Sequence, residues 1–118
     1  MVRPSRRTPD RGDIVWIDFN PQTGHEQAGR RPAVVLSPAL YNGRTGLALL
    51  CPVTNQVKGY PFEVAIPQGL SVTGVILADQ VKSLDWRQRN AAIVARVPQE
   101  TIDKILECLD ILMGKDDV

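Results

Sequence analysis

The sequence predicts a mainly β protein with a C-terminal helix, arranged as a small, curled, mostly antiparallel barrel. Three observations lead to this fold class. Short apolar or alternating segments recur between residues 13 and 97, polar stretches with Gly and Pro separate them, and the hydrophobic period lengthens to three and four residues after Pro98. Five or six short strands followed by one helix are typical of small barrels. We expect a single domain over residues 1–118, because a chain of this length builds one core.

The expected strands are bounded by turn-forming residues. The segment 13–19, Asp-Ile-Val-Trp-Ile-Asp-Phe, is rich in β-branched and aromatic residues and lies between Gly12 and Pro21. Polar stretches at 20–31, 41–46 and 55–60 are expected to be loops or turns. The other expected strands cover residues 33–36, 47–53, 62–66, 74–78 and 91–97.

The last segment has the pattern of an amphipathic helix. Pro98 suits a first helical position, and Glu100 suits the positive end of the helix dipole. Gly114 supplies the stop. The apolar positions are Ile102, Ile105, Leu106, Leu109, Leu112 and Met113. This apolar face could cover one mouth of the barrel or join the helix of a partner, and the sequence leaves both open.

Composition excludes several classes of protein. No apolar run approaches the roughly 20 residues of a membrane span, and residues 1–10 lack the apolar core of a secretory signal, so we expect a cytoplasmic protein. Cys51 and Cys108 are then expected to be reduced core residues. The formal net charge of +1 argues against coating nucleic acid by bulk charge. Residues 1–11 carry four arginines and are expected to form a flexible basic arm.

Three polar clusters are candidates for chemistry, each with a structural alternative. The loop 23–32 combines an acid, an imidazole, an amide and two guanidiniums, but it could be only a solvated loop. The segment 51–62 sets a cation beside aromatic rings, which suits unpaired bases, although such rings also start hairpins. The segment 78–89 offers groups for base edges and phosphates, and its Trp86 could stack or simply pack.

The sequence lacks several patterns that mark known classes of catalytic or metal-binding site, and this excludes several mechanisms. The single histidine, His25, excludes a two-histidine acid–base pair. No His, Cys, Asp or Glu spacing suits a metal, so no metal or cofactor is expected. A Gly-rich phosphate loop followed by Lys is also absent, and Ser37, Ser71 and Ser83 have no evident base.

Six stretches of this sequence, in order and with compatible spacing, resemble the MazF/PemK family of toxin–antitoxin endoribonucleases. The resemblance runs from about Asp10 to the C-terminal helix. It is carried by Gly12-Asp-Ile-Val-Trp-Ile-Asp-Phe19, Glu26-Gln-Ala-Gly-Arg-Arg-Pro-Ala-Val-Val-Leu-Ser-Pro38, Tyr41-Asn42, Lys58-Gly-Tyr-Pro-Phe-Glu-Val64, Leu77-Ala-Asp-Gln-Val-Lys-Ser83 and Trp86-Arg87.

The resemblance implies an SH3-like (CcdB/PemK-like) barrel that forms a homodimer. It implies metal-independent cleavage of single-stranded RNA, in which the RNA's own 2′-hydroxyl attacks the phosphate and leaves a 2′,3′-cyclic phosphate and a 5′-hydroxyl. The expected partner is an antitoxin with an acidic, flexible C-terminal tail. In the alternative, a toxin on the same fold poisons gyrase without enzymatic activity. A helix ending in tryptophan marks such toxins, and this helix has no aromatic residue. An RNA-binding barrel without catalysis is a third possibility.

By the same resemblance, the catalytic residues are Arg31, Thr54 and Glu26. A guanidinium and a hydroxyl suit the charge that develops on the phosphate, and Glu26 is a better base than Arg31, which stays protonated. The residues expected to bind RNA are Phe19, Gln27, Asn42, Lys58, Tyr60, Asp79, Gln80 and Lys82. Some family members have an Arg two residues before the aspartate that matches Asp79. Leu77 stands there, so the acid–base roles of that Arg–Asp pair do not carry over.

Overall fold

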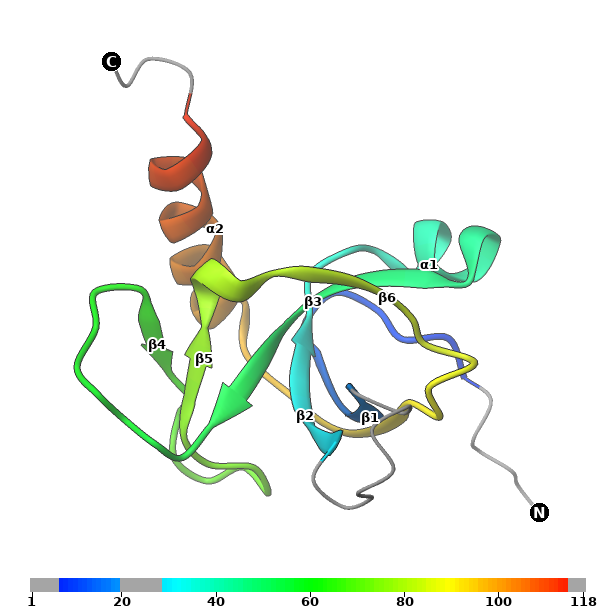
Figure 1. Cartoon of the computed structure of the whole chain (residues 1–118), viewed down its shortest axis with the longest axis horizontal. Helices are drawn as coiled ribbons and strands as arrows, with labels where there is room; N and C mark the ends of the chain where they lie inside the picture. The colour runs from blue at the N-terminus through cyan, green and yellow to red at the C-terminus, as the bar shows by residue number, and fades with distance from the viewer. Residues whose placement is uncertain (1–6, 20–28, 115–118) are drawn as a thin grey trace.

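The structure, a computed structural model of the 118-residue chain, describes residues 7–19 and 29–114. It is mainly β with a C-terminal helix, as the sequence predicts (Figure 1). The strands are β1 (Asp13–Asp18), β2 (Arg30–Val35), β3 (Leu47–Thr54), β4 (Glu63–Ala65), β5 (Val75–Leu77), β6 (Lys82–Asp85) and β7 (Ala92–Arg96). The helices are α1 (Ala39–Thr45), α2 (Gln99–Met113) and the short 3-10 turn η3 (Ala78–Gln80).

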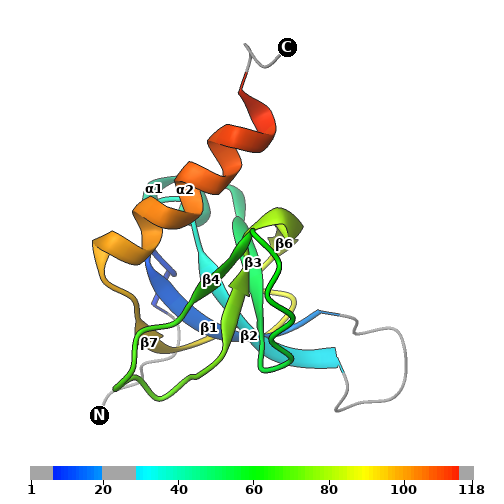
Figure 2. The same ribbon diagram turned by 90° about the vertical axis from the view of Figure 1, so that its left-hand side faces the viewer.

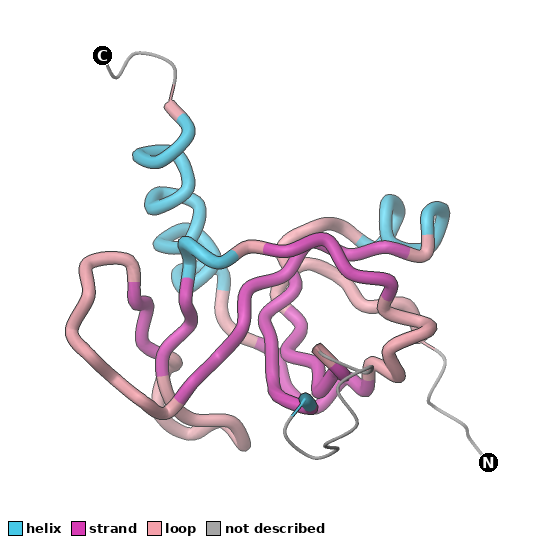
Figure 3. Tube along the Cα trace, in the orientation of Figure 1, coloured by secondary structure: helices cyan, strands magenta, loops and turns pink. Residues whose placement is uncertain are grey.

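The strands form one antiparallel sheet whose order is β4-β5-β3-β2-β1-β7, with β6 joined to β3 beside this path. The sheet curls, but β4 and β7 end the order without pairing with each other in the described part of the chain, so the expected barrel is open (Figure 3). Strand β3 holds the sheet together. Its start pairs with β6, its middle with β2 and its end with β5.

Successive residues of the central strands enter two different cores. Ile14, Val34 and Cys51 belong to a cluster that also contains Ile102 and Ile105 of α2. Their neighbours belong to a second cluster around Trp86, and these are Val15, Ile17, Ala33, Val35, Ala48 and Leu50. Because side chains alternate between the faces of a strand, both faces of β1–β3 are buried. This explains why these strands are almost continuously apolar in the sequence.

Helix α2 covers one face of the sheet mainly with its N-terminal half, and Cys108 and Leu109 pack against the same core. Thr101, Ile102 and Ile105 are buried, whereas Ile111 and Met113 at the other end are exposed. Figure 2 shows this end projecting beyond the sheet. The helix begins at Gln99, so Pro98 is the N-cap residue rather than the expected first helical residue, and Gly114 follows the last helical residue as expected. No helix in the described residues is long and apolar enough to span a membrane.

Four expectations about local structure are wrong. The expected loop 20–31 ends too late, because Arg30 and Arg31 belong to β2. Residues 41–46 form most of helix α1 rather than a turn, and β6 is a strand that the polar sequence Lys-Ser-Leu-Asp does not indicate. Residues 9–11 do not belong to a flexible arm, because Pro9 is fully buried and the Arg11 Nε donates to the Leu36 carbonyl at 2.6 Å. Residues 1–6 lie outside the described residues.

Helix α1 forms because of contacts with distant parts of the chain. The Asp10 carboxylate accepts a hydrogen bond from the Ala39 N–H at 2.8 Å and so caps the helix in place of Pro38, which makes no side-chain cap. This bond spans 29 residues, so no local pattern reveals it.

Asn42 connects α1 to the rest of the molecule. Its side chain is fully buried and donates to the carbonyls of Pro9 (2.8 Å) and Ser37 (2.9 Å), while accepting from the Ser37 hydroxyl at 2.6 Å. Its backbone carbonyl accepts from the Trp86 indole at 3.0 Å. Asn42 is therefore a structural residue. Its expected role in RNA binding is withdrawn, because the amide is both inaccessible and fully used.

Replacement of Asn42 by Ala should destabilise the fold by about 3 kcal/mol, because buried donors and acceptors lose their partners. Chemical denaturation measures this loss. Gln68→Ala removes an exposed amide of similar size and should change the free energy of unfolding by less than about 0.5 kcal/mol. Equal small losses in both variants would contradict the structural role.

Candidate functional site

A cavity of about 400 Å³ brings together residues from four neighbouring strands and the turn between β3 and β4. It contains two of the three residues expected to be catalytic and four of those expected to bind RNA. Its lining residues are Arg31, Thr54, Gln56, Lys58, Tyr60, Phe62, Glu63, Leu77, Asp79 and Gln80. Segments that are far apart in the sequence therefore line the same cavity.

The strand register accounts for this gathering. The ladder between β2 and β3 ends with Ala33 opposite Pro52, and two residues further along both strands the same register sets Arg31 opposite Thr54. On the other side of β3, Thr54 pairs with Val75 of β5, and Leu77 of β5 pairs with Glu63 of β4. Positions two apart share a face, so Arg31, Thr54, Leu77 and Glu63 all lie on one face of the sheet, with Leu77 and Glu63 two positions beyond the pair of Thr54 and Val75.

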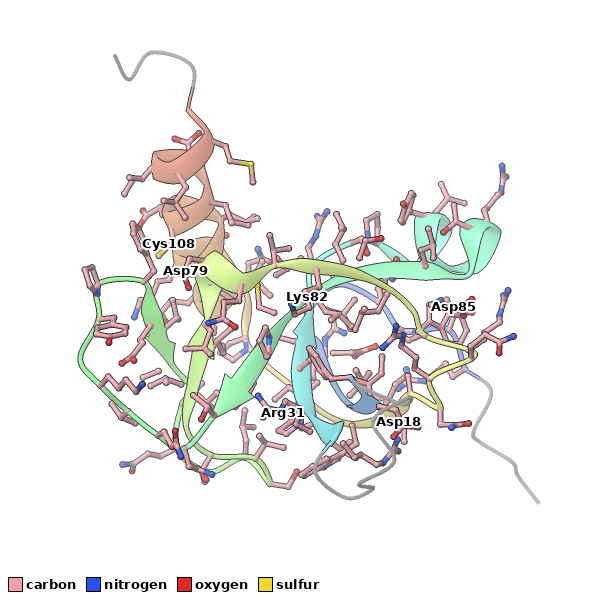
Figure 4. All side chains as sticks on the ribbon, viewed as in Figure 1. Asp18, Arg31, Asp79, Lys82, Asp85 and Cys108 are labelled. Atoms are coloured by element: carbon pink, nitrogen blue, oxygen red, sulfur yellow. The ribbon has the colours of Figure 1, made fainter. Side chains whose placement is uncertain are left out.

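The same alternation separates two adjacent arginines. Arg30 donates to the Asp18 carboxylate at 2.9 Å and to the Asn90 carbonyl at 3.0 Å, so its guanidinium joins β2 to the turn before β7. Arg31 points to the other face and is exposed beside β3 (Figure 4). Within the described residues it forms no ion pair, and its guanidinium carbon lies 5.9 Å from the centre of the Phe19 ring. Arg31 is thus the arginine that faces the cavity.

Thr54 ends β3 with its hydroxyl held in place. The hydroxyl oxygen accepts a hydrogen bond from the Gln56 N–H at 3.0 Å, which leaves its own proton available for a ligand. Behind it, Gly74 packs so closely that a Cβ there would lie 2.3 Å from the Thr54 carbonyl oxygen. Gly74 also has φ +118°, a conformation that L side chains rarely adopt. This glycine lets β5 approach the end of β3.

The turn after Thr54 supplies a cation and a ring to the cavity mouth. The Lys58 ammonium lies 5.9 Å from the centre of the Tyr60 ring, and Tyr60 is 60% exposed. Both carboxylate oxygens of Glu63 accept backbone N–H groups of this turn. Sequence reasoning missed Glu63, since in an alternating strand it is expected to be an ordinary surface residue. It also missed Gln56 and Gly74.

The remaining predicted residues lie in different surroundings. Asp79 and Gln80, in η3, line the cavity and are exposed, and Figure 4 shows Asp79 near Cys108 of α2. Phe19 is half-buried under Arg31. Lys82 is exposed on β6 but does not line the cavity. Glu26, Gln27 and His25 lie outside the described residues.

Trp86 and the cysteines are structural. Trp86 is buried in the second core, so packing is its role, and the Arg87 guanidinium covers its ring at 4.8 Å. Burial raises the pKa of the Cys51 thiol to about 12, with a further contribution from the charge of Asp79, so it is protonated at neutral pH. Burial also raises the pKa of Cys108, which is only half-buried rather than in the core. Neither thiol is an activated nucleophile.

Charge in the cavity is mixed rather than uniformly basic. Two cations, Arg31 and Lys58, face two carboxylates, Glu63 and Asp79. Among residues 7–19 and 29–114, no group of three or more His, Cys, Asp or Glu side chains could hold a metal ion. The arrangement offers a guanidinium and a hydroxyl for an anionic group, next to a ring and amide groups suited to a flat polar ligand.

Comparison with known proteins finds a matching family and relatives whose names agree with that family. Residues 10–113 match the family described as PemK-like, MazF-like toxin of type II toxin–antitoxin system. The chain is 52% identical to the endoribonuclease toxin MazF of Escherichia coli K12, over 93% of this chain and 98% of that protein. It is 32% identical to the endoribonuclease PemK of Escherichia coli, over 88% and 81% of the two chains.

Two solved structures from Deinococcus radiodurans share this fold. One is MazF, with a TM-score of 0.84, 55% sequence identity and coverage of 92% of this chain and 98% of that chain. The other is a MazE–MazF structure, with a TM-score of 0.82, 49% identity and coverage of 92% and 97%.

Gly74→Ala should destabilise the protein by about 3 kcal/mol, from an unfavourable φ and from collision with the Thr54 carbonyl. Gly69→Ala is the matched control. Gly69 has φ +97° but nothing lies within 4 Å of where its added methyl would be, so only the conformational cost of about 1 kcal/mol remains. Denaturation measures both losses, and the amide shifts of Thr54 in NMR spectra should change in Gly74→Ala alone. Equal losses would contradict a close contact at Thr54.

Low pH should weaken the hydrogen bonds by which the Asp18 carboxylate joins β1 to β2 and to the turn before β7. Hydrogen bonds from the Asn90 amide and then from Arg30 lower the pKa of the Asp18 carboxyl below its usual 3.8. Because the folded-state pKa is the lower one, this carboxylate stabilises the fold above pH 3.8 and loses that contribution as the pH falls through the folded-state value. Denaturation between about pH 5 and pH 2 should therefore show a steeper loss in the wild type than in Asp18→Asn. Parallel curves would contradict this.

Proposed function

The chain belongs to the PemK-like, MazF-like toxin family of type II toxin–antitoxin systems, and we propose that it is an endoribonuclease toxin that cleaves single-stranded RNA without a metal ion. The observation that carries this proposal is the cavity in which Arg31 and Thr54 meet beside Lys58, Tyr60 and Gln80. Cleavage of messenger RNA at short sequences would stop translation and growth.

The proposed chemistry is transfer of the phosphate to the neighbouring 2′-oxygen. The 2′-hydroxyl loses its proton to a base and attacks phosphorus, the bond to the 5′-oxygen breaks, and that oxygen takes up a proton. The products are a 2′,3′-cyclic phosphate and a 5′-hydroxyl. Negative charge gathers on the non-bridging oxygens during attack. The forked donors of Arg31 suit this charge, and the free proton of the Thr54 hydroxyl gives a second contact.

Glu26 is the proposed general base, although it lies outside the described residues. Arg31 is unsuited to that role, because a guanidinium stays protonated at any ordinary pH. The Cys51 thiol is unsuited as well, since its pKa is raised to about 12. Stabilisation of charge is thus the role that fits Arg31.

The other cavity residues are proposed to hold the bases. The Tyr60 ring is exposed for stacking, with the Lys58 ammonium beside it for a phosphate. Asp79 and Gln80, which line the same cavity, offer acceptors and donors for base edges. The Phe19 ring lies beside the Arg31 guanidinium, and Lys82 remains a proposed contact for RNA outside the cavity. Gln27, which lies outside the described residues, also remains a proposed RNA contact.

The proposed partners are a cognate antitoxin and a second copy of this chain, in the cytoplasm. An antitoxin tail rich in acidic residues could occupy the cavity through Arg31 and Lys58 and so exclude RNA. The MazE–MazF structure from Deinococcus radiodurans, 49% identical, supports this partner. Exposed apolar side chains at the projecting end of α2, among them Ile111 and Met113, support a homodimer.

The alternative of a gyrase-poisoning toxin has no support from the relatives named above, which carry the names MazF and PemK. An RNA-binding protein without catalysis would keep Lys58 and Tyr60 but would not need a free guanidinium opposite a free hydroxyl. The cavity therefore favours the nuclease.

The purified protein should cleave single-stranded RNA in EDTA, and a 2′-deoxy substitution at the cut site should abolish cleavage while binding persists. Sequencing the 5′ ends of the fragments identifies that site. Arg31→Ala and Thr54→Val should each lower kcat roughly 100- to 1000-fold, because each removes one donor to the developing charge. Thr54→Ser keeps the hydroxyl and should retain most activity. Arg44→Ala removes an exposed arginine of α1 and serves as the control.

Cleavage that survives the 2′-deoxy change would rule out this mechanism. Growth arrest that persists unchanged in both Arg31→Ala and Thr54→Val cells would show that catalysis is not the function. Arrest of supercoiling with intact RNA would instead support the gyrase alternative.

A further inference from the structure

We infer that Glu63 is a positioning residue for RNA binding: its carboxylate holds the turn that presents Lys58 and Tyr60 to the substrate. The inference rests on the proposed function and concerns the same cavity. Glu63 acts through the backbone of its own chain and is not a catalytic residue.

The contacts of Glu63 fix the turn at consecutive points. Its Oε2 accepts the Lys58 N–H at 3.1 Å, and its Oε1 accepts the Gly59 N–H at 2.9 Å. The backbone N–H of Glu63 donates in turn to the Tyr60 carbonyl at 3.1 Å. Successive backbone N–H groups form a concavity that suits an anion, and here the anion belongs to the protein itself. One residue therefore bonds to three successive residues of the turn.

Gly59 gives the turn the backbone shape that this arrangement needs. Its φ is +79°, a conformation that favours glycine, although nothing lies within 4 Å of where a Cβ would be. The reason for glycine here is conformational, not steric. The ends of the turn are also held, by the Gln56 N–H on the Thr54 hydroxyl and by the Ala78 N–H on the Phe62 carbonyl at 3.0 Å.

The charge of Glu63 has the wrong sign for direct contact with RNA. Glu63 pairs with Leu77 and lies on the same face of the sheet as Thr54 and Arg31, and its side chain lines the cavity with theirs. An acid in that position repels phosphates. Its two hydrogen bonds to backbone N–H groups explain why a carboxylate is useful there, since charged acceptors make the stronger bonds.

Holding the turn should favour binding rather than the chemical step. Lys58 and Tyr60 are exposed, so in a loose turn RNA binding would have to order them, and that ordering weakens affinity. Arg31 and Thr54 are carried by strands whose pairing does not involve Glu63. Loss of the carboxylate should accordingly raise KM and leave kcat almost unchanged.

The test measures steady-state cleavage of a short RNA that contains the mapped cut site, by wild type, Glu63→Ala, Glu63→Gln and Glu107→Ala. Glu63→Ala should raise KM about tenfold, and Glu63→Gln, which keeps one acceptor oxygen, should raise it less, with kcat within about twofold in both. Glu107→Ala removes the same charge from the exposed face of α2 and should not raise KM. If Glu63 acted only by repelling RNA, loss of its negative charge would lower KM. A rise in KM therefore indicates positioning of the turn, and a fall indicates charge repulsion alone.

A double-mutant cycle tests whether Glu63 acts through Lys58. Lys58→Ala should raise KM clearly in the wild-type background and by a much smaller factor in the Glu63→Ala background, because the ammonium is already misplaced there. Equal factors in the two backgrounds would overturn the inference. So would an unchanged or lowered KM in Glu63→Ala, or a fall in kcat alone.

Two controls keep these outcomes distinct. If the wild type cleaves no RNA, the proposed function fails, whereas normal wild-type cleavage with unaffected Glu63 variants defeats only the positioning role. Thermal unfolding checks that the variants fold. If Glu63→Ala does not fold, Gly59→Ala disturbs the same turn without removing a charge, and it must then raise KM at constant kcat for the inference to stand.

Discussion

The structure depends on the burial of both faces of its three central strands. Most apolar residues of β1, β2 and β3 belong to one of two cores, and the register of these strands is therefore fixed, since a slip of one residue would exchange the cores. The apolar pattern ends where the strands leave the second core. At those ends polar residues replace apolar ones on the same face, and Arg31 and Thr54 are such residues. The cavity is the uncovered continuation of a buried face.

The alternation of side chains between the two faces of β2 also gives neighbouring residues different roles. Arg30 and Arg31 are chemically identical, yet alternation directs one to the Asp18 carboxylate and the other to the cavity. A guanidinium paired with a carboxylate has fewer free N–H donors and less uncompensated charge with which to bind a phosphate. The ion pair of Arg30 thus belongs to the framework, while Arg31 keeps its donors for a ligand.

The sequence was sufficient for what depends on local pattern and insufficient for what depends on distant contacts. Periodicity correctly predicted β1, β3 and α2, because their burial repeats along the chain. It failed at α1, whose cap comes from Asp10 and whose Asn42 bonds to Pro9 and Trp86, all far away in sequence. The pairing of Arg31 with Thr54 came from family resemblance, and no spacing rule connects two residues 23 positions apart in this sequence. Glu63 gave no signal, since a carboxylate that binds its own backbone looks like any surface acid.

In the site, the residues proposed for the chemical step lie on strands, and the residues proposed for RNA recognition lie on a turn. Arg31 and Thr54 lie on strands whose positions are set by ladders on both sides of β3, so their separation is insensitive to changes elsewhere on the surface. Lys58 and Tyr60 lie on a turn without regular structure, fixed chiefly by the Glu63 carboxylate and the shape of Gly59. Side chains on such a turn can be exchanged without moving a strand, as long as the carboxylate and the glycine remain. The fold can therefore alter which RNA it binds while the phosphate meets the same guanidinium and hydroxyl.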